Sequence, residues 1–223
     1  MRIKKKLGVM ILIKPRSVIL DTLFLVQVVC SDTSFSNHSV TDRYKFIALL
    51  DTDEVIIPIK HANWMDMMDD VVGQLRDKKK EFASWNFRNV YFLDNMTDLL
   101  DPQPDEDIPK EFHMMRHVYR SAKYNAPLAN VKSFYNPEKV LTVHNHLPHA
   151  VFPNTERTFS VDSEVGHLQH YRTWCAWYLS EVCAKDFMAN PLRDTTIWRW
   201  KEPVAANVSL VLSELFPKQS VEE

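Results

Sequence analysis

Residues 43–58 read RYKFIALLDTDEVIIP, two apolar runs on either side of an acidic turn. The run at 44–50 is short, aromatic-rich and stopped by polar residues, which predicts a buried strand. The run at 55–57 predicts a second extended piece, closed by the proline that follows it. Because residues i and i+2 of an extended segment face the same side, Asp51 and Asp53 are expected to converge on one hard cation. The stretch therefore predicts a Mn²⁺ or Mg²⁺ site at the end of a strand.

Apolar periodicity along the rest of the chain predicts a mixture of strands and helices. Residues 64–80 carry apolar side chains at helical spacing, and the lysines that end this segment suit the negative end of a helix dipole. Strands are expected at 82–93, 112–119, 132–135 and 139–144, helices at 166–188 and 203–215, and an acidic loop at 101–109. Together these elements predict a mixed α/β fold in one compact unit.

Glycine is scarce in this chain of 223 residues. Only Gly8, Gly73 and Gly166 are present, whereas average usage would give roughly 16. Three such distant glycines exclude a dinucleotide-binding loop, a Walker A loop and a kinase-type loop, each of which needs close glycines. A nucleotide would therefore have to be bound through a metal held by carboxylates. The net charge of -2 gives no case for nucleic-acid binding.

The three cysteines are Cys30, Cys175 and Cys183. An odd number does not suggest a disulfide framework, and no CxxC pair is present for zinc. Cys175 and Cys183 would lie about 12 Å apart along one helix, which is too far for a disulfide between them. They are therefore expected to be ordinary buried cysteines.

The amino-terminal segment, residues 1–30, combines a basic start with interrupted apolar runs. A basic patch before apolar residues favours a membrane anchor, but no uninterrupted stretch approaches the ~20 residues of a spanning helix. The alternative is an amphipathic or buried helix at a truncated start. Sequons at Asn37, Asn95 and Asn207 favour the secretory pathway and a glycoprotein, because each could accept a glycan there.

A histidine cluster lies in VHNHLPH, residues 143–149. Imidazole is a good ligand for Mn²⁺ or Zn²⁺, so one of these histidines could complete the acidic metal site. The alternatives are a zinc hydrolase site built on His144, His146 and His149, and a polar turn with partly exposed histidines. A nuclease of the HNH type is disfavoured, because the chain lacks basic composition.

The tripeptide His170-Tyr171-Arg172 is expected on or just before a helix. Arginine is always charged and binds phosphate through two hydrogen bonds. Histidine can donate to a diphosphate or take part in proton transfer. The alternative is an ordinary helix start.

Three segments together resemble glycosyltransferase family 92. They are RYKFIALLDTDEVIIP, VKSFYNPEKVLTVHNHLPH at 131–149 and QHYR at 169–172, and they follow the order of the family's motifs within about residues 43–190. The resemblance implies a partial GT-A-like mixed sheet flanked by helices, in a catalytic domain at 31–223. Characterised members are metal-dependent, inverting galactosyltransferases of the secretory pathway, held in the Golgi membrane by an amino-terminal anchor. They use UDP-galactose as donor and extend glycans.

The resemblance also implies roles for individual residues. Asp51 and Asp53 match the DxD motif and would anchor Mn²⁺ and the UDP diphosphate, with Glu54 as the adjacent acidic residue. His144 matches the histidine after the K-S segment and is expected as the third metal ligand. The residues expected near the diphosphate are His170 and Arg172 of the HYR motif and Lys132 of the K-S segment, whose role is open.

The catalytic base is expected to be a carboxylate that deprotonates the acceptor hydroxyl as it attacks C1 of the sugar. Asp162 and Glu164 precede the HYR motif and are the candidates, although no motif assigns them. Val55 departs from the family pattern, which has Phe at this position. Only 50 residues precede Asp51, so the domain is expected to be truncated and to lack part of its nucleotide-binding half. The alternative function is therefore that of an inactive relative acting as a glycan-binding or interaction protein.

Overall fold

The computed structural model describes residues 8–13, 44–76, 80–94, 96, 100, 108–109, 112–174 and 180–215. In these residues the strands form two five-stranded sheets and one two-stranded sheet. The first sheet, in spatial order, contains β1 (Gly8–Ile13), β2 (Phe46–Asp51), β7 (Lys132–Tyr135), β4 (Ser84–Phe87) and β10 (Phe159–Ser160). The second contains β12 (Pro191–Arg193), β6 (Tyr119–Ser121), β5 (Asn89–Leu93), β11 (Gly166–Arg172) and β3 (Glu54–Pro58). The small sheet pairs β8 (Val140–Thr142) with β9 (Ala150–Val151).

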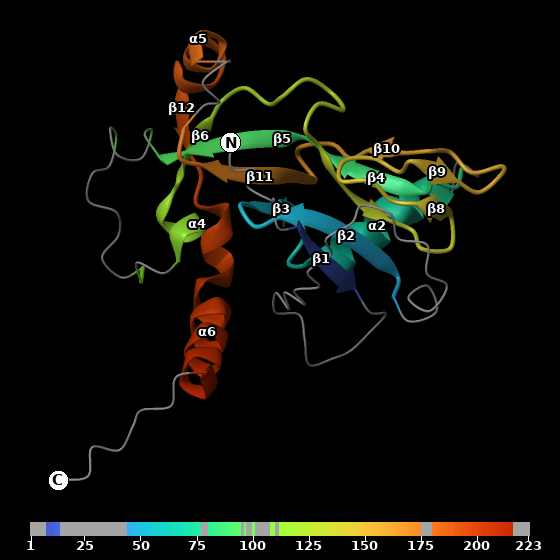
Figure 1. The fold of residues 1–223 in the computed structure, drawn as a ribbon, viewed down its shortest axis with the longest axis horizontal. Coiled ribbons are helices and arrows are strands. Elements are labelled where there is room, and N and C mark those ends of the chain that lie inside the picture. The colour runs from blue at the N-terminus through green and yellow to red at the C-terminus, as the bar shows by residue number, and fades with distance from the viewer. Residues whose placement is uncertain are drawn as a thin grey trace, which may run out of the picture.

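Three chain segments pass from the first sheet into the second. They are the consecutive strand pairs β2–β3, β4–β5 and β10–β11. The last two pairs run side by side, because β10 is parallel to β4 and β11 is parallel to β5. Figure 1 shows β11 between β5 and β3, with the strands of the first sheet continuing to one side. The sheets are therefore joined along these crossings, and the acidic turn lies at one of them.

The helices are few and lie around the sheets. They are α2 (Trp64–Arg76), α4 (His113–Arg116), α5 (Ser180–Cys183), which continues into a π-helical turn at Ala184–Met188, and α6 (Lys201–Leu215), which follows a 3-10 turn at Thr196–Trp200. In Figure 1, α6 extends away from the end of the second sheet near α4. None of the helices in the described residues is long and apolar enough to cross a bilayer.

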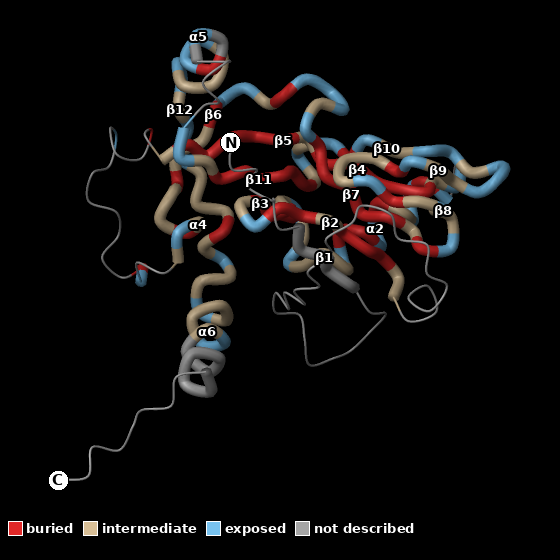
Figure 2. The backbone as a smooth tube through the Cα atoms, viewed as in Figure 1, coloured by how far each residue is buried: buried red, intermediate tan, exposed pale blue. Residues whose placement is uncertain are grey.

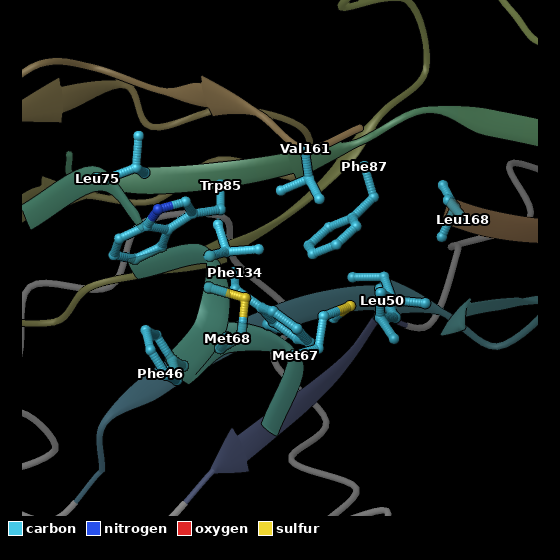
Figure 3. Packing of buried hydrophobic residues seen from close by; sticks show 13 residues of the cluster. Phe46, Leu50, Met67, Met68, Leu75, Trp85, Phe87, Phe134, Val161 and Leu168 are labelled. Atoms are coloured by element: carbon cyan, nitrogen blue, oxygen red, sulfur yellow. The ribbon is translucent and has the colours of Figure 1, made fainter. Parts of the chain in front are cut away.

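The main hydrophobic core lies between α2 and the first sheet and reaches into the second. Helix α2 contributes Met67, Met68, Val71 and Leu75 from one face, as its helical spacing requires. Phe134 contacts the rings of its neighbours at centroid distances of 5.3 to 6.3 Å. Figure 3 shows Leu168 of β11 on the same core, opposite Phe87 and Leu50. The buried backbone in Figure 2 accordingly follows the strands of both sheets.

Most of the predicted elements are confirmed. The mixed α/β class is correct, and strands or helices are found within 44–50, 55–57, 64–80, 82–93, 132–135, 139–144 and 203–215. Of the acidic loop expected at 101–109, residues 101–107 lie outside the described residues. Residues 8–13 form a strand paired with β2 rather than a helix, and the rest of the amino-terminal segment, on which the anchor prediction depends, lies outside the described residues. Cys183 is buried as expected but is disulfide-bonded, which corrects the prediction of a free thiol; Cys30 and Cys175 lie outside the described residues.

Two element predictions are wrong. The segment at 112–119 contains the helical turn α4, and a strand begins only at Tyr119. The segment predicted to be helical from Gly166 begins with a strand, because its first seven residues form β11; residues 175–179 lie outside the described residues, and α5 is described from Ser180. All residues of this strand except Arg172 are buried, and the strand lies between β5 and β3, although most of its side chains are polar. These polar side chains find hydrogen-bond partners in the strand itself and on neighbouring segments of the fold. The strand therefore lacks the alternation of apolar and polar residues by which a strand is recognised in a sequence.

One face of β11 carries a connected row of buried polar groups. Tyr171 Oη donates to Gln169 Oε1 at 2.7 Å, and Gln169 Nε2 lies 3.2 Å from His167 Nε2, to which it donates. His167 Nδ1 lies 2.9 Å from the hydroxyl of Tyr124. This arrangement suits a neutral imidazole, because a proton on Nε2 would face the amide hydrogens of Gln169. Burial lowers the pKa of His167 to about 4.

The low pKa of His167 predicts a loss of stability in mild acid. The unfolded chain takes up a proton near pH 6.5, whereas the folded chain does so only near pH 4. Stability is therefore full above pH 6.5 and falls as the pH drops, by up to about 3 kcal/mol from this group. Urea unfolding between pH 7.5 and 4.5 measures the slope. His167→Gln should flatten it; an unchanged slope would contradict the assignment.

We predict that packing requires a glycine at position 166, because the structure leaves no room there for a Cβ atom. A Cβ at this position would lie 2.6 Å from Met67 Sδ, 3.2 Å from Phe87 Cε1 and 3.3 Å from the carbonyl oxygen of Ile57. Gly166→Ala should therefore destabilise the protein by about 1–3 kcal/mol in urea unfolding. Gly73 in α2 has nothing within 4 Å of its position for a Cβ, so Gly73→Ala should instead stabilise by about 0.5–1 kcal/mol. Similar effects of the two changes would refute this difference.

Candidate functional site

The acidic motif lies where the chain turns from the first sheet into the second. Asp51 ends β2, Thr52 and Asp53 form a turn, and Glu54 begins β3. The backbone N–H of Asp51 donates to Glu54 Oε2 at 3.0 Å, and the N–H of Tyr171 donates to the carbonyl oxygen of Asp53 at 2.8 Å. The expectation of an extended DxD segment is therefore wrong, because the change of sheet requires a tight turn.

Lys132 at the start of β7 forms ion pairs with two of the acidic residues. Its side chain is fully buried, and its Nζ lies 3.2 Å from Asp51 Oδ2 and 3.0 Å from Glu54 Oε2. The third contact of Nζ is with Asn145 Oδ1 at 2.6 Å. An ammonium group has three protons, and here each has an acceptor. The open role of Lys132 is thus an ionic one, and the cation shared by Asp51 and Glu54 is this lysine.

Asp53 points the other way and meets His170. Its side chain is 42% exposed, and its Oδ2 lies 3.4 Å from His170 Nε2. His170 Nδ1 lies 3.3 Å from Glu54 Oε1 and 3.0 Å from Asn89 Nδ2. The Nε2 atom is buried and has no hydrogen-bond partner. The turn therefore presents one accessible carboxylate beside an imidazole nitrogen that is available to a further ligand.

Arg172 lies on the same face of β11 as His170, two residues further along the strand. Its guanidinium lies 6.0 Å from the centre of the Tyr91 ring, and that ring lies 5.4 Å from the ring of His170. The Tyr91 hydroxyl accepts hydrogen bonds from Nδ2 of Asn125 and Nδ2 of Asn130. The HYR motif thus places the His170 imidazole beside the acidic turn. The half-buried Arg172 guanidinium lies next to it, and the Tyr91 ring contacts both groups.

The charges of this cluster favour a divalent cation. The cluster contains three carboxylates and one lysine, which leaves two negative charges when His170 is neutral. Carboxylate oxygen is the preferred donor for Mg²⁺, and imidazole also suits Mn²⁺. Asp53 Oδ2 and His170 Nε2 therefore fit such an ion. We call Asp51, Asp53, Glu54, Lys132 and His170 the acidic cluster.

His144 is not part of this cluster. It is exposed, its carbonyl oxygen accepts a hydrogen bond from the Tyr135 hydroxyl at 2.5 Å, and its ring lies 6.2 Å from that of His146. Among the described residues, the ring nitrogens of His144 do not lie within 4.8 Å of carboxylate oxygens of both Asp51 and Asp53. The ring nitrogens of His144, His146 and His149 do not come within this distance of one another as a group of three either. The role of His144 as third ligand stays a prediction, and the nitrogen beside Asp53 is that of His170.

Asp162 and Glu164 lie at the opposite end of β11 from His170. Both are exposed, and Asp162 Oδ1 accepts a hydrogen bond from the N–H of Glu164 at 2.9 Å in the turn before the strand. Four residues of strand between Gly166 and His170 span about 13 Å. The structure does not bring these carboxylates to the acidic cluster, and their role as a base stays a prediction.

Sequence reasoning missed the neutral partners of the cluster, Asn89, Tyr91 and Asn145. Asn89 and Tyr91 lie in β5 and belong to no motif, and Asn145 lies in the histidine cluster at 143–149, where only the histidines stood out as ligands. A surface depression of about 500 Å³ lies elsewhere, around β12 at the opposite edge of the second sheet from β3. It contains none of the predicted site residues, and two of its arginines are already bound to Asp194 and to backbone carbonyl oxygens. It is therefore a weaker candidate than the acidic cluster.

The burial of Lys132 predicts a large loss of stability when its charge is removed. Lys132→Met would leave the buried carboxylates of Asp51 and Glu54 without their cation, at a cost of about 3–5 kcal/mol in urea unfolding. The matched control is Lys139→Met, which breaks a solvent-exposed pair with Glu81 and should have little effect. Equal effects of the two substitutions would show that the buried pair has no special role.

No curated protein matches this chain. The model of the family described as "Glycosyltransferase family 92" matches residues 37–209, well over half of the chain. The matched residues include the acidic turn, Lys132 and the HYR motif, which the fold brings together. The chain therefore belongs to glycosyltransferase family 92.

Proposed function

We propose that this chain is a metal-dependent, inverting transferase that moves galactose from UDP-galactose to a glycan acceptor. Membership of the family makes it a glycosyltransferase with a nucleotide-sugar donor and a glycan acceptor. The observation that supports the finer proposal is the pairing of an accessible Asp53 carboxylate with His170 Nε2 at 3.4 Å. A diphosphate donor needs a cation and a basic group near its phosphates, and this part of the site has donors for both.

Asp53 and His170 are the residues that would hold Mn²⁺ or Mg²⁺ in this proposal. The ion, when bound, neutralises the diphosphate and stabilises the departing UDP. Asp51 serves differently, because its carboxylate lies against Lys132 inside the turn. Asp51, Glu54 and Lys132 thus position the turn, and Asp53 presents its carboxylate outward.

Arg172 is placed to bind the phosphates of the donor. Its guanidinium lies at the carboxyl end of β11, where ligands of α/β sheets bind, and its charge would balance the diphosphate. The acceptor hydroxyl would attack the anomeric carbon on the face opposite UDP, and its proton would pass to a carboxylate. Inversion of the anomeric configuration follows from this geometry.

We also propose the secretory pathway, and the Golgi within it, as the location. The disulfide at Cys183 supports an oxidising compartment, because disulfides are rare in reducing ones. Asn207 of the third sequon is exposed on α6, so its side chain could be reached by a glycosylating enzyme. The protein would then be a glycoprotein that meets its glycan acceptors in the same compartment.

The proposal predicts that Asp53→Asn loses metal-dependent UDP binding while the protein stays folded. Asparagine keeps the size of the side chain but removes the charge that attracts the cation. Calorimetry with UDP and Mn²⁺ should give an affinity at least about tenfold weaker than that of the wild type. Asp162→Asn is the matched control, since its carboxylate lies in a distant turn and UDP binding should persist.

Two outcomes would count against the proposal. Equal UDP affinity in the wild type and Asp53→Asn would remove Asp53 from the metal site. A folded wild type that binds no UDP and releases none from UDP-galactose in the presence of glycan acceptors would favour the inactive, glycan-binding alternative. Comparison of UDP-galactose with other UDP-hexoses in the same assay tests the donor.

A further inference from the structure

A second cluster of metal-ligating side chains lies at the end of β5. Asp94 directly follows this strand, His113 is the first residue of α4, and His117 is the residue that caps the carboxyl end of α4. Asp94 Oδ1 lies 3.6 Å from His113 Nε2 and 3.2 Å from His117 Nε2. In the described residues, this is the group of three whose ligand atoms all lie within 4.8 Å of one another. It shares no residue with the acidic cluster.

The hydrogen bonding of His117 leaves its Nε2 facing an acceptor. His117 Nδ1 lies 2.6 Å from the carbonyl oxygen of His113, and a carbonyl only accepts, so Nδ1 carries a proton. In the neutral ring Nε2 then has a lone pair, and this atom lies 3.2 Å from Asp94 Oδ1. That oxygen is buried and accepts no hydrogen bond. Two acceptor atoms in such contact require a positive charge between them, either a proton or a metal ion.

The distances suit a tetrahedral metal ion. Zinc binds imidazole nitrogen and carboxylate oxygen at about 2.0–2.2 Å, which places neighbouring ligands about 3.3 Å apart on a tetrahedron. His113 and His117 lie at the two ends of the single turn of α4, and both Nε2 atoms reach the same oxygen of Asp94. The hydrogen bond from Nδ1 of His117 to a backbone carbonyl is the usual device that orients a zinc-binding imidazole. His113 is exposed, so an ion can enter and water can occupy the fourth position.

We propose that Asp94, His113 and His117 form a zinc site. The ion would fasten α4 to the carboxyl end of β5. Helix α4 is already tied to the segment before α6, because Trp198 Nε1 donates to the carbonyl oxygen of Met115 at 2.8 Å. Zinc would thereby stabilise this whole end of the second sheet. Leu93 is paired with Arg172, so the zinc site lies one residue beyond the arginine proposed to bind the donor phosphates.

The site differs from the acidic cluster in its chemistry. Two imidazoles and one carboxylate favour zinc, whereas the acidic cluster offers mostly oxygen to a harder ion. The competing explanation is a protonated His117 that forms an ion pair with Asp94 and binds no metal. The two explanations differ in zinc content, which can be measured without UDP or any acceptor.

The test uses the full chain without a histidine tag, stripped with a chelator and dialysed against Zn²⁺. We expect one zinc per chain by elemental analysis in the wild type, retained on further dialysis. His113→Ala and His117→Ala should lose this zinc. His149→Ala, which removes an exposed histidine outside the cluster, is the matched control and should keep it. A wild type without stoichiometric zinc, or histidine variants that retain it, would overturn the proposal.

A second measurement covers variants that fail to fold. X-ray absorption at the zinc edge of the wild type should show two imidazoles and additional oxygen ligands, and zinc should raise the melting temperature. Scattering from three imidazoles would move the ion to the turn at 143–149 and overturn the assignment. A melting temperature unchanged by bound zinc would overturn the fastening role of the ion.

Discussion

The burial of Lys132 between Asp51 and Glu54 is the interaction on which the rest of the site depends. Burying charged groups is costly unless they are paired and hydrogen-bonded, and here one ammonium has three acceptors. The three residues come from β7, β2 and β3, so the contact holds the first sheet to the beginning of the second. It closes the turn in which Asp53 is left accessible.

Strand β11 connects the acidic cluster to the main hydrophobic core. Leu168 on one face packs in the main core, and His170 on the same face reaches the acidic cluster. The opposite face carries the row of His167, Gln169 and Tyr171, which are satisfied by one another and by Tyr124. A strand that is buried on both faces has little freedom to shift, so the positions of His170 and Arg172 follow from the packing of the whole sheet.

Both proposed cation sites lie at the carboxyl ends of the parallel strands β5 and β11. At this edge of an α/β sheet the strands end and loops begin, so polar side chains from different segments meet there. The acidic cluster suits a cation that acts with a diphosphate, while Asp94, His113 and His117 suit a zinc ion that stabilises the fold. The difference lies in the donor atoms and in the exposure of each group, not in the position on the sheet.

The sequence by itself determined the α/β class, most of the strands and α2, because these follow from local apolar periodicity. It also marked the acidic turn and the HYR motif, since their residue types are unusual at that spacing. The predictions for β11 and α4 were wrong. Because α4 was not predicted, His113 and His117 were not recognised as a pair, since their spacing brings them together only across a helical turn.

Only the tertiary structure decided which groups meet. It paired Asp51 and Glu54 with Lys132, 81 and 78 positions away in sequence, and it placed His170 rather than His144 beside Asp53. Such contacts depend on sheet register and on the crossings between sheets. A polar side chain carries no sign of its distant partner in its own sequence neighbourhood, so those contacts could not be predicted from the sequence.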